Sequence, residues 1–569
     1  MDTSKKIRIG DLLLERQLIT ASQLQQALAE QKRSGKKLGR AITDLGFLAE
    51  EQLLGTLAEC FHFPFIELSR FRIDAALVQR LPERQARRYR AILLAEEGGG
   101  YRVGMADPTD LMLVDELQRA LGRPVLPAFV REQELLTLLD SLYRRQEQIA
   151  SIAGELEGEL QASDFDIDQM ALDSDSSDAP VVRLLQNLFE DAVQVKASDI
   201  HIEPEETLLR IRLRIDGDLQ EQIMKEKRVA SALVSRLKIM SGLDISEKRL
   251  PQDGRFNIRV SNKSIDVRLS TMPVPFGESV VMRLLDQSGG LLDIERLGMP
   301  APLRQRFCHL IQRPHGLILV TGPTGSGKTT TLYAALNLLN RPEKKIITAE
   351  DPVEYRLPRI NQVQINSKVG LEFATVLRAA LRQDPDIVLV GEMRDQETAE
   401  IGLRAAMTGH MVLSTLHTND AASSAMRLLD MGVDTYLVAS SLRAVVAQRL
   451  IKRLCPNCIQ PQPLQEQERA WLNAMEAGAA DHSYRSGHGC HQCHNTGYQG
   501  RVGIYELLEI RGPLITALRD NNANAFAEAA ARQPDFRPLG LVALDYARQG
   551  WTSLEEVFRV SATLDEANG

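Results

Sequence analysis

A glycine-rich segment between an apolar run and a helical pattern carries the strongest chemical signal in this chain. In "GLILVTGPTGSGKTTTLYAALNLL", the apolar run 316–321 leads into Gly322-x-x-x-x-Gly327-Lys328-Thr329. Glycines let several backbone N–H groups face one anion, the lysine reaches the β- and γ-phosphates, and the threonine hydroxyl meets Mg²⁺. The sequence therefore predicts a nucleoside triphosphate site with Mg²⁺. The residues that we expect at the nucleotide are Gly322, Pro323, Thr324, Gly325, Ser326, Gly327, Lys328, Thr329 and Thr330.

Carboxylates follow two other apolar segments of the same region. In "DPDIVLVGEMRD" the run 387–390 is followed by Gly391 and Glu392, and "IITAEDPVEYR" ends in Glu350, Asp351 and Glu354. Carboxylates at the ends of parallel strands beside a phosphate loop can hold Mg²⁺ or its water shell, and one of them can orient the attacking water. For each carboxylate the alternative is a solvated surface position.

Two histidines flank a further apolar run in "MTGHMVLSTLHTND". His417 comes after the run, where it could sense a γ-phosphate, and His410 comes before it. A structural role is the alternative for both, because a lone histidine usually has one.

These four segments resemble the motifs of a known family. "GPTGSGKTT", "EDPVEY", "LRQDPDIVLVGEMRD" and "TGHMVLSTLHTND" look like the Walker A, Asp box, Walker B and His box of the secretion ATPases, which power type II secretion and type IV pilus assembly. The resemblance covers about residues 179–560. It implies that ATP is the substrate, that Glu354 is the catalytic glutamate and Glu392 the Walker B glutamate, and that His410 and His417 are the His-box pair.

The same resemblance nominates two arginines from the preceding domain. "DVRLSTMPVPFGESVVMRLL" matches the segment that reaches the γ-phosphate in the family, which selects Arg268 and Arg283. A planar guanidinium spreads over the oxygens that gain charge in phosphoryl transfer. Strand arginines that merely pair with surface acids are the alternative. The family also implies a homohexamer whose domains rotate as rigid bodies beneath an inner-membrane platform protein.

Four of the six cysteines form two tight pairs, "CPNC" and "CHQC", separated by the segment 459–489. Four thiolates in one small module suit structural Zn²⁺, because they leave no open position for substrate. Disulfides or an iron–sulfur site are the alternatives. The resemblance agrees, since assembly ATPases of the type II secretion kind carry a four-cysteine module at this place. The expected ligands are Cys455, Cys458, Cys490 and Cys493.

The beginning of the chain repeats itself. Residues 8–31 and 37–60 align with six identities, and the two units open with "RIG" and "KLG". A helical core built from two units is the simple interpretation. A basic side chain beside a glycine that exposes backbone N–H groups also suits a phosphate or a guanine edge.

This repeat resembles the cyclic di-GMP-binding N-terminal (MshEN-type) domain of MSHA-pilus biogenesis ATPases. Three positions depart from that pattern: Lys37 replaces an arginine, Cys60 a glutamine, and Gln17 a glycine. The resemblance implies cyclic di-GMP as a regulatory ligand. For Asp107 the alternative is a turn-forming residue before proline. The expected contacts are Arg8, Gly10, Lys37, Gly39, Arg40, Asp44 and Asp107.

The elements that must position these residues suggest a multidomain α/β chain. The fold class that we predict is a RecA-like P-loop ATPase core, preceded by a PAS-like α+β domain and an N-terminal helical and mixed domain, with a small four-cysteine zinc module. The predicted ranges are 1–145 for the N-terminal domain, 146–178 for an acidic linker, 179–293 for the arginine-bearing domain, 294–453 for the ATPase domain, 454–505 for the zinc module and 506–569 for a helical C-terminal segment.

Composition sets limits on location and partners. The 44% apolar and 25% charged content is ordinary for a globular protein, and the sequence contains neither an apolar run long enough to cross a membrane nor a secretion signal. We therefore expect a cytoplasmic protein, held at the bacterial inner membrane through partners. Nine acids between 155 and 178 leave the rest of the chain near neutrality, so no nucleic-acid surface is expected.

The function predicted from these observations is an ATPase motor for type IV, MSHA-like pilus assembly under cyclic di-GMP control. One alternative is a type II secretion ATPase that drives a pseudopilus without that control. Another is a nucleotide-binding second-messenger switch with little turnover, and a third is a DNA-translocating relative.

Overall fold

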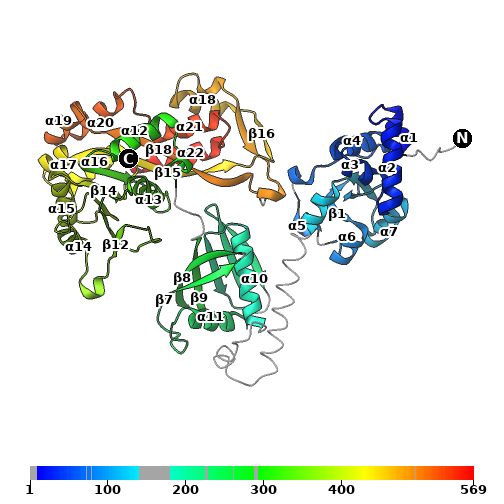
Figure 1. Ribbon diagram of the computed structural model, residues 1–569, viewed down its shortest axis with the longest axis horizontal. Helices are drawn as coiled ribbons and strands as arrows, with labels where there is room; N and C mark the ends of the chain where they lie inside the picture. Colours follow the sequence, from blue (N-terminus) through cyan, green and yellow to red (C-terminus); the bar gives the residue numbers. More distant parts are fainter. Residues whose placement is uncertain are drawn as a thin grey trace. The chain divides into compact units, whose positions relative to one another are not determined.

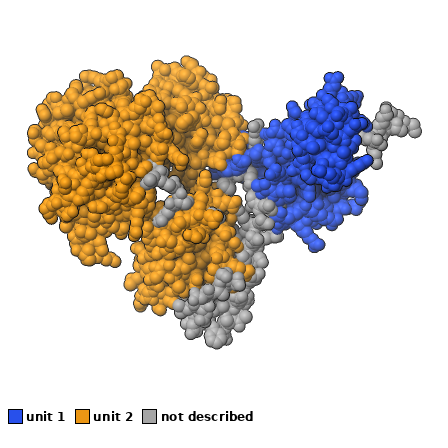
Figure 2. Space-filling model, viewed as in Figure 1, with its two compact units in different colours: residues 1–151, 488–497 blue, residues 152–487, 498–569 orange. Residues whose placement is uncertain are grey.

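The computed structural model describes residues 9–139, 180–224, 229–286 and 293–568, apart from positions 72, 79, 261 and 494. Arg8 and the predicted acidic linker 146–178 lie outside the described residues. The chain divides into two compact units, residues 1–151 with 488–497 and residues 152–487 with 498–569 (Figure 2).

Unit 1 begins with the same helical pair twice. Helices α1 (Ile9–Glu15) and α2 (Ala21–Ser34) come from the first repeat, and α3 (Leu38–Asp44) and α4 (Glu50–Phe61) from the second. The turns also match, because Leu18 N–H donates to Leu13 O and, at the equivalent positions of the second repeat, Phe47 N–H donates to Ile42 O. The alignment of the repeats therefore corresponds to a repeated backbone structure.

The rest of unit 1 is a small mixed layer. Its sheet has the order β1-β2-β3, with the first pair antiparallel and the second parallel. The segment "AILLAEEGGGYRVGM" forms the antiparallel pair β1 and β2, joined at Gly98 and Gly99. The elements are η1 (Leu68–Arg70), α5 (Ala75–Val78), α6 (Glu83–Tyr89), β1 (Ala91–Glu97), β2 (Gly100–Met105), α7 (Leu111–Leu121) and β3 (Val125–Phe129).

Unit 2 begins with an antiparallel sheet of order β6-β5-β4-β9-β8-β7, with α10 packed on β7 and α11 on β9 (Figure 1). Apolar residues alternate along β8, where Ile265, Val267 and Leu269 are buried, so the intervening Arg268 lies on the other face. The elements are α10 (Pro180–Gln194), β4 (Asp199–Pro204), β5 (Leu209–Ile215), β6 (Asp218–Met224), α11 (Val229–Met240), β7 (Gln252–Val260), β8 (Lys263–Val274) and β9 (Gly277–Asp286).

The larger part of unit 2 is a seven-stranded sheet of order β12-β11-β13-β14-β10-β15-β18. Leu317 and Leu319 of β10 belong to one hydrophobic core and Ile318 and Val320 to another, so this strand is covered on both faces. Burial on both sides explains why the central strands are continuous apolar runs. The elements up to β14 are η3 (Ile294–Leu297), α12 (Ala301–Ile311), β10 (Gly316–Thr321), α13 (Lys328–Leu339), β11 (Ile346–Glu350), β12 (Asn361–Gln364), η4 (Ser367–Val369), α14 (Phe373–Ala380), β13 (Ile387–Val390), α15 (Gln396–Met407) and β14 (Met411–Leu416).

The chain continues through two long strands and a helical end. The structure places the end of the predicted zinc module differently, because β18 runs across position 506 and pairs antiparallel with β15 in the central sheet. The C-terminal helices therefore start at α19, after that strand. The elements are α16 (Ala421–Asp430), α17 (Thr435–Ser441), β15 (Leu442–Leu454), β16 (Ile459–Gln462), α18 (Glu466–Met475), η5 (Ala479–Asp481), β17 (Tyr484–Gly487), η6 (His491–Cys493), β18 (Tyr498–Glu509), α19 (Pro513–Arg519), α20 (Ala523–Ala531), α21 (Leu539–Arg548) and α22 (Leu554–Asn568).

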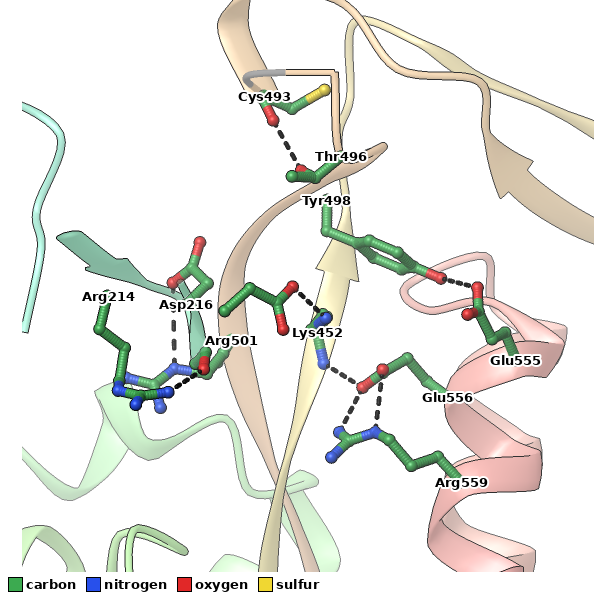
Figure 3. Close-up of polar contacts among 12 residues, drawn as sticks. Arg214, Asp216, Lys452, Cys493, Thr496, Tyr498, Arg501, Glu555, Glu556 and Arg559 are labelled. Carbon is green, nitrogen blue, oxygen red and sulfur yellow. Dashed lines mark hydrogen bonds and ion pairs between the residues drawn. The ribbon is translucent and has the colours of Figure 1, made fainter. Parts of the chain in front are cut away.

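The turn between β5 and β6 contacts the antiparallel strands β15 and β18 (Figure 3). Asp218 Oδ2 lies 2.5 Å from Lys452 Nζ, and Gly500 N–H donates to Asp216 Oδ2 at 2.7 Å. The Lys452 N–H in turn donates to Glu556 of α22. One turn of the antiparallel domain is thus tied to the strands β15 and β18.

Among the described residues, no helix combines the length and the apolar character needed to cross a membrane.

Candidate functional site

Four parallel strands deliver the predicted ATPase residues to one edge of the central sheet. β10, β11, β13 and β14 all pair in parallel, so their carboxyl ends meet at the same edge. Ligands of open α/β sheets bind at that edge. The phosphate loop follows β10, Glu350 ends β11, Glu392 follows β13, and His417 follows β14.

The phosphate loop has the backbone that its glycines require. Gly325 and Gly327 have φ values of 79° and 89°, in the left-handed region that glycine adopts without steric cost. Lys328 Nζ donates to the carbonyl oxygens of Gly322 at 2.7 Å and Pro323 at 3.0 Å. Burial, and then the charge of Arg449, lowers the pKa of Lys328 to about 8. Thr329 is exposed at the start of α13, directly after the loop.

Glu392 and His417 lie together beside this loop. His417 Nε2 is 3.2 Å from Glu392 Oε2, and Arg394 also pairs with that carboxylate. Burial, and then the charges of Lys328 and Arg394, lowers the pKa of His417, which favours the neutral ring. The sequence placed both residues at the site, and the structure brings them together.

His410 is not brought to this edge. It precedes β14 instead of following it, and its Nδ1 is 3.0 Å from Ala405 O at the end of α15. Since β14 runs away from His410 toward His417, the two histidines lie at opposite ends of the strand.

Glu350 and Glu354 differ in their surroundings. Glu350 is 4% exposed and accepts hydrogen bonds from Tyr333, Thr348 and Gln362. Glu354 is more open, and its Oε2 lies 2.7 Å from Arg268 Nη2. Of the two carboxylates, Glu354 is therefore the one available to a substrate.

The two nominated arginines are direct cross-strand neighbours on β8 and β9. Arg268 reaches Glu354 and also donates to Val353 O at 3.2 Å. Arg283 instead donates to Asp199 Oδ1 at 3.2 Å, and its side chain is 59% exposed. Both line a cavity of about 590 Å³ together with Asp199 and Pro352.

Two buried side chains near the loop were missed from the sequence. Arg449 is 8% exposed, and its guanidinium donates to Gln448 O and to Asn419. Tyr333, one helical turn beyond Thr329, is 1% exposed and bonds to Glu350. The signal for Arg449 is a pair of polar residues that ends an apolar run, "AVVAQR"; nothing in the sequence marks Tyr333.

The four paired cysteines form one buried cluster, with all four sulfurs within 4.8 Å of one another. Cys490 and Cys493 Sγ are 3.7 Å apart, and sulfurs on a tetrahedral Zn²⁺ with bonds of about 2.3 Å lie at roughly that separation. The Gly497 N–H points at Cys493 Sγ at 3.3 Å, as an N–H group does toward a thiolate. These residues fit a structural Zn²⁺.

In unit 1, the structure joins two of the predicted cyclic di-GMP residues that are 70 positions apart in the sequence. Lys37 Nζ lies 2.5 Å from Asp107 Oδ2, while Asp107 Oδ1 accepts from Thr109 as in a turn. Although burial raises it, the hydrogen bonds from Lys37 and Thr109 bring the pKa of Asp107 below its usual value.

Arg40 and Asp44 form a second pair in unit 1. Arg40 Nε is 3.2 Å from Asp44 Oδ1, and Lys36 also bonds to Asp44, which lowers the pKa of that carboxyl. Both residues line a cavity of about 460 Å³ that also involves Gly46 and Gln133.

Gly10 and Gly39, which were predicted as ligand contacts, also have a packing role. A Cβ at Gly10 would lie 2.9 Å from Leu24 Cδ1, and a Cβ at Gly39 would lie 3.2 Å from Leu53 Cδ2. Leu24 and Leu53 are equivalent positions of the repeat. Each glycine thus lets its helix approach the following helix of the same repeat.

Comparison with known proteins identifies two families in this chain. A family model described as "Type II/IV secretion system protein" matches residues 174–559, and one described as "MshEN domain" matches residues 61–149. The type IV pilus assembly ATPase PilB of Myxococcus xanthus is 41% identical over 561 residues, 97% of this chain and 98% of that protein. The type II secretion system protein E of Aeromonas hydrophila is 44% identical over 86% of this chain and 98% of its own length.

A solved structure shares the fold of the ATPase part. The Legionella pneumophila ATPase DotB covers 67% of this chain and 96% of its own, with a TM-score of 0.50 and 20% identity. Together with the ordered motifs at one sheet edge, the family match and the full-length relatives show that this chain is an ATP-hydrolysing enzyme and belongs to the type II/IV secretion system protein family.

Proposed function

We propose that this chain is the motor that hydrolyses ATP to assemble a type IV pilus of the MSHA kind, under control of cyclic di-GMP. It works as a homohexamer in the cytoplasm, docked beneath an inner-membrane platform protein. The MshEN-domain match beside a secretion ATPase domain is the observation that carries this combination.

The ATPase residues have separate roles in this proposal. The phosphate loop and Lys328 hold the triphosphate, while Thr329 and Glu392 hold Mg²⁺, which neutralises charge on the transferred phosphoryl group. Glu354 orients the attacking water, and His417 senses the γ-phosphate beside Glu392. Arg268 and Arg283 stabilise transferred charge when the arginine-bearing domain rotates toward a nucleotide.

Steady-state turnover of the full chain separates a motor from a switch. A motor hydrolyses ATP far faster than Lys328→Ala does, whereas a switch gives the same low rate in both. DNA-stimulated turnover would instead favour the DNA-translocating alternative, which the near-neutral charge outside the acidic linker argues against.

The regulatory part of the proposal rests on two cations of the second repeat and their acidic partners. Lys37 with Asp107 and Arg40 with Asp44 present cation–carboxylate pairs on the surface of unit 1. Such pairs suit cyclic di-GMP, because its phosphates replace the carboxylates at the cations while the freed carboxylates meet guanine N–H groups.

Calorimetric titration of the full chain with cyclic di-GMP tests this part, with ADP in excess to occupy the phosphate loop. We expect one saturable ligand per chain and about tenfold weaker binding in Lys37→Ala, as for a lost charge-assisted bond. Lys32→Ala, an exposed lysine on α2, is the matched control and keeps wild-type affinity. An absence of heat and of thermal shift would leave a secretion ATPase whose repeat docks only a partner protein.

Structural Zn²⁺ is the third component. A metal-sensitive dye should detect one zinc per chain released from the wild type on unfolding, and none from the double variant Cys455→Ser, Cys490→Ser. A chain that is metal-free as purified, and whose melting temperature does not respond to added zinc, would contradict the assignment.

A further inference from the structure

A buried phenol joins the phosphate-loop helix to the segment that carries Glu354. Tyr333 lies on α13, five residues after Lys328, and is 1% exposed. Its hydroxyl donates to Glu350 Oε2 and accepts from the Glu354 N–H at 3.2 Å. One oxygen thus connects the helix that begins at the phosphates to the main chain of Glu354.

That main chain is held from two sides at a single peptide bond. The carbonyl oxygen of Val353 accepts from Arg268 Nη2 at 3.2 Å, and the N–H of the same peptide, on Glu354, donates to Tyr333. Arg268 also pairs with the Glu354 carboxylate at 2.7 Å. The orientation of this peptide therefore depends on one residue of the phosphate-loop helix and one of the arginine-bearing domain.

Glu350 fixes the direction in which the phenol donates. Its carboxylate is 4% exposed and also accepts from Thr348 and Gln362, so it offers Tyr333 a stationary acceptor. Burial, and then the charge of Glu350, raises the pKa of Tyr333, which keeps its proton on the hydroxyl. With that proton directed at Glu350, a lone pair remains for the Glu354 N–H.

Tyr355 provides a built-in comparison. Its ring packs edge-on against Tyr333 with centroids 4.5 Å apart, and it is half-buried in the same place. Its hydroxyl is buried and has no hydrogen-bond partner among the described residues. Tyr355 directly follows Glu354 in the chain, but of the two hydroxyls it is that of Tyr333 which accepts from the Glu354 N–H.

We propose that Tyr333 is a positioning residue for ATP hydrolysis: its hydroxyl holds the Val353–Glu354 peptide so that movement of α13 at the nucleotide is passed to Glu354. The inference rests on the proposed role of Glu354 in orienting water. Tyr333 touches neither substrate nor Mg²⁺ in this scheme, and acts through the backbone of the next segment.

Steady-state kinetics of full-length Tyr333→Phe and Tyr355→Phe test the proposal. We expect Tyr333→Phe to lower kcat about tenfold with KM for ATP within about twofold, since a misplaced group lowers turnover without removing binding. Tyr355→Phe should keep wild-type kcat. Equal kcat in the two variants would overturn the proposal, because the hydroxyl of Tyr333 would then have no special effect on turnover. Loss of binding of a fluorescent ATP analogue to Tyr333→Phe would also overturn it, because the residue would then act on nucleotide binding.

Combining the substitution with Glu354→Gln separates this inference from the function on which it rests. If Tyr333 acts through Glu354, Tyr333→Phe causes no further loss of kcat in the Glu354→Gln background, whereas a full additional loss would overturn the inference. If Glu354→Gln alone keeps wild-type kcat, the proposed role of Glu354 has failed. A low kcat in Glu354→Gln together with a wild-type kcat in Tyr333→Phe would contradict only the positioning role of Tyr333.

Discussion

The two candidate ligand sites of this chain hold their charges in different surroundings. At the nucleotide site, Lys328 is half-buried beyond the end of β10, a strand whose every residue is buried. In unit 1, the Lys37 side chain is 78% exposed at the start of a short helix, α3. One site is built on the interior of a sheet and the other on a helical surface.

The difference affects how much each charged group contributes. A charge near the interior acts through a lower effective dielectric, so its electrostatic interaction with neighbouring groups is stronger. Removing such a charge therefore has a large effect on those groups. Ion pairs between exposed side chains contribute about 0 to 1 kcal/mol, because water and salt screen them. Substitutions at the nucleotide site should therefore have large effects, and substitutions on the surface of unit 1 smaller ones.

Lys328→Ala gives the largest expected effect. We expect kcat/KM for ATP to fall about 100-fold or more, because the positioned cation that meets the transferred phosphates is lost. Lys344→Ala is the control: this lysine pairs with Asp386 at the opposite edge of the sheet and should leave turnover unchanged. A comparable loss in both variants would remove the contrast between the two sheet edges.

Arg268 and Arg283 sharpen the comparison within one sheet. Arg268→Ala should lower kcat roughly 10- to 100-fold, because it removes both the pairing of Glu354 and a donor to its peptide. Arg283→Ala should lower kcat less, since its guanidinium is exposed and pairs with Asp199. Turnover at saturating ATP measures both, and the reverse order would show that Arg283 contributes more to turnover than Arg268.

Local order was the part of the ATPase site that the sequence could predict. The apolar run 316–321, the glycine loop and the helical pattern became β10, a left-handed loop and α13, and the run 387–390 became β13 with the same bounds. These elements are defined by periodicity and glycine content over short stretches of chain, so neighbouring residues suffice to predict them.

Contacts between segments far apart in the sequence could not be predicted from neighbouring residues. The Tyr333–Glu350 bond depends on how α13 packs beside β11, and Arg449 of β15 reaches Asn419, which follows β14. No spacing in the sequence encodes either distance. The difference between Arg268 and Arg283, equivalent as residue types, likewise comes only from which carboxylate lies within reach.

A buried carboxylate behind the nucleotide site predicts a pH effect of intermediate size. Glu506 is 3% exposed and accepts from the Ala421 and Leu539 N–H groups, and burial raises its pKa to about 7. The folded chain therefore holds a proton that the unfolded chain loses above about pH 4.5, so this group stabilises the fold at low pH. Because its pKa rises from 4.5 to about 7 on folding, its contribution is about 3 kcal/mol, and it is lost as the pH rises through about 7.

Glu506→Gln isolates this contribution because glutamine does not titrate. The stability of the wild type relative to the variant should fall between pH 5 and pH 8, measured by hydrogen exchange at the starts of α16 and α21. Asp44, a surface carboxyl whose pKa is lowered by Lys36, has the opposite sign: its contribution is lost only as the pH falls through the lowered pKa. A pH-independent difference between the wild type and Glu506→Gln would mean that Glu506 stays ionised.

The smallest expected effect lies in the turns of the repeat. Gln17 has φ 56°, and Gly46, its equivalent in the second repeat, has φ 71°. The left-handed conformation of this turn explains why the related pattern has a glycine there, and Gln17 adopts it at a steric cost. We expect Gln17→Gly to stabilise unit 1 by about 0.5 to 1 kcal/mol, and Gly46→Ala to destabilise it by a similar amount.

Hydrogen exchange of helices α1 to α4 in the full chain measures both changes, since it reports unit 1 without isolating it. A gain in the first turn and a loss in the second would show that the repeats share a backbone requirement independent of any ligand. If neither variant alters protection but both weaken cyclic di-GMP binding, the turns serve the ligand directly. The preference for glycine would then come from ligand binding. Unit 1 would share with the nucleotide site a glycine-bearing turn whose backbone serves the ligand.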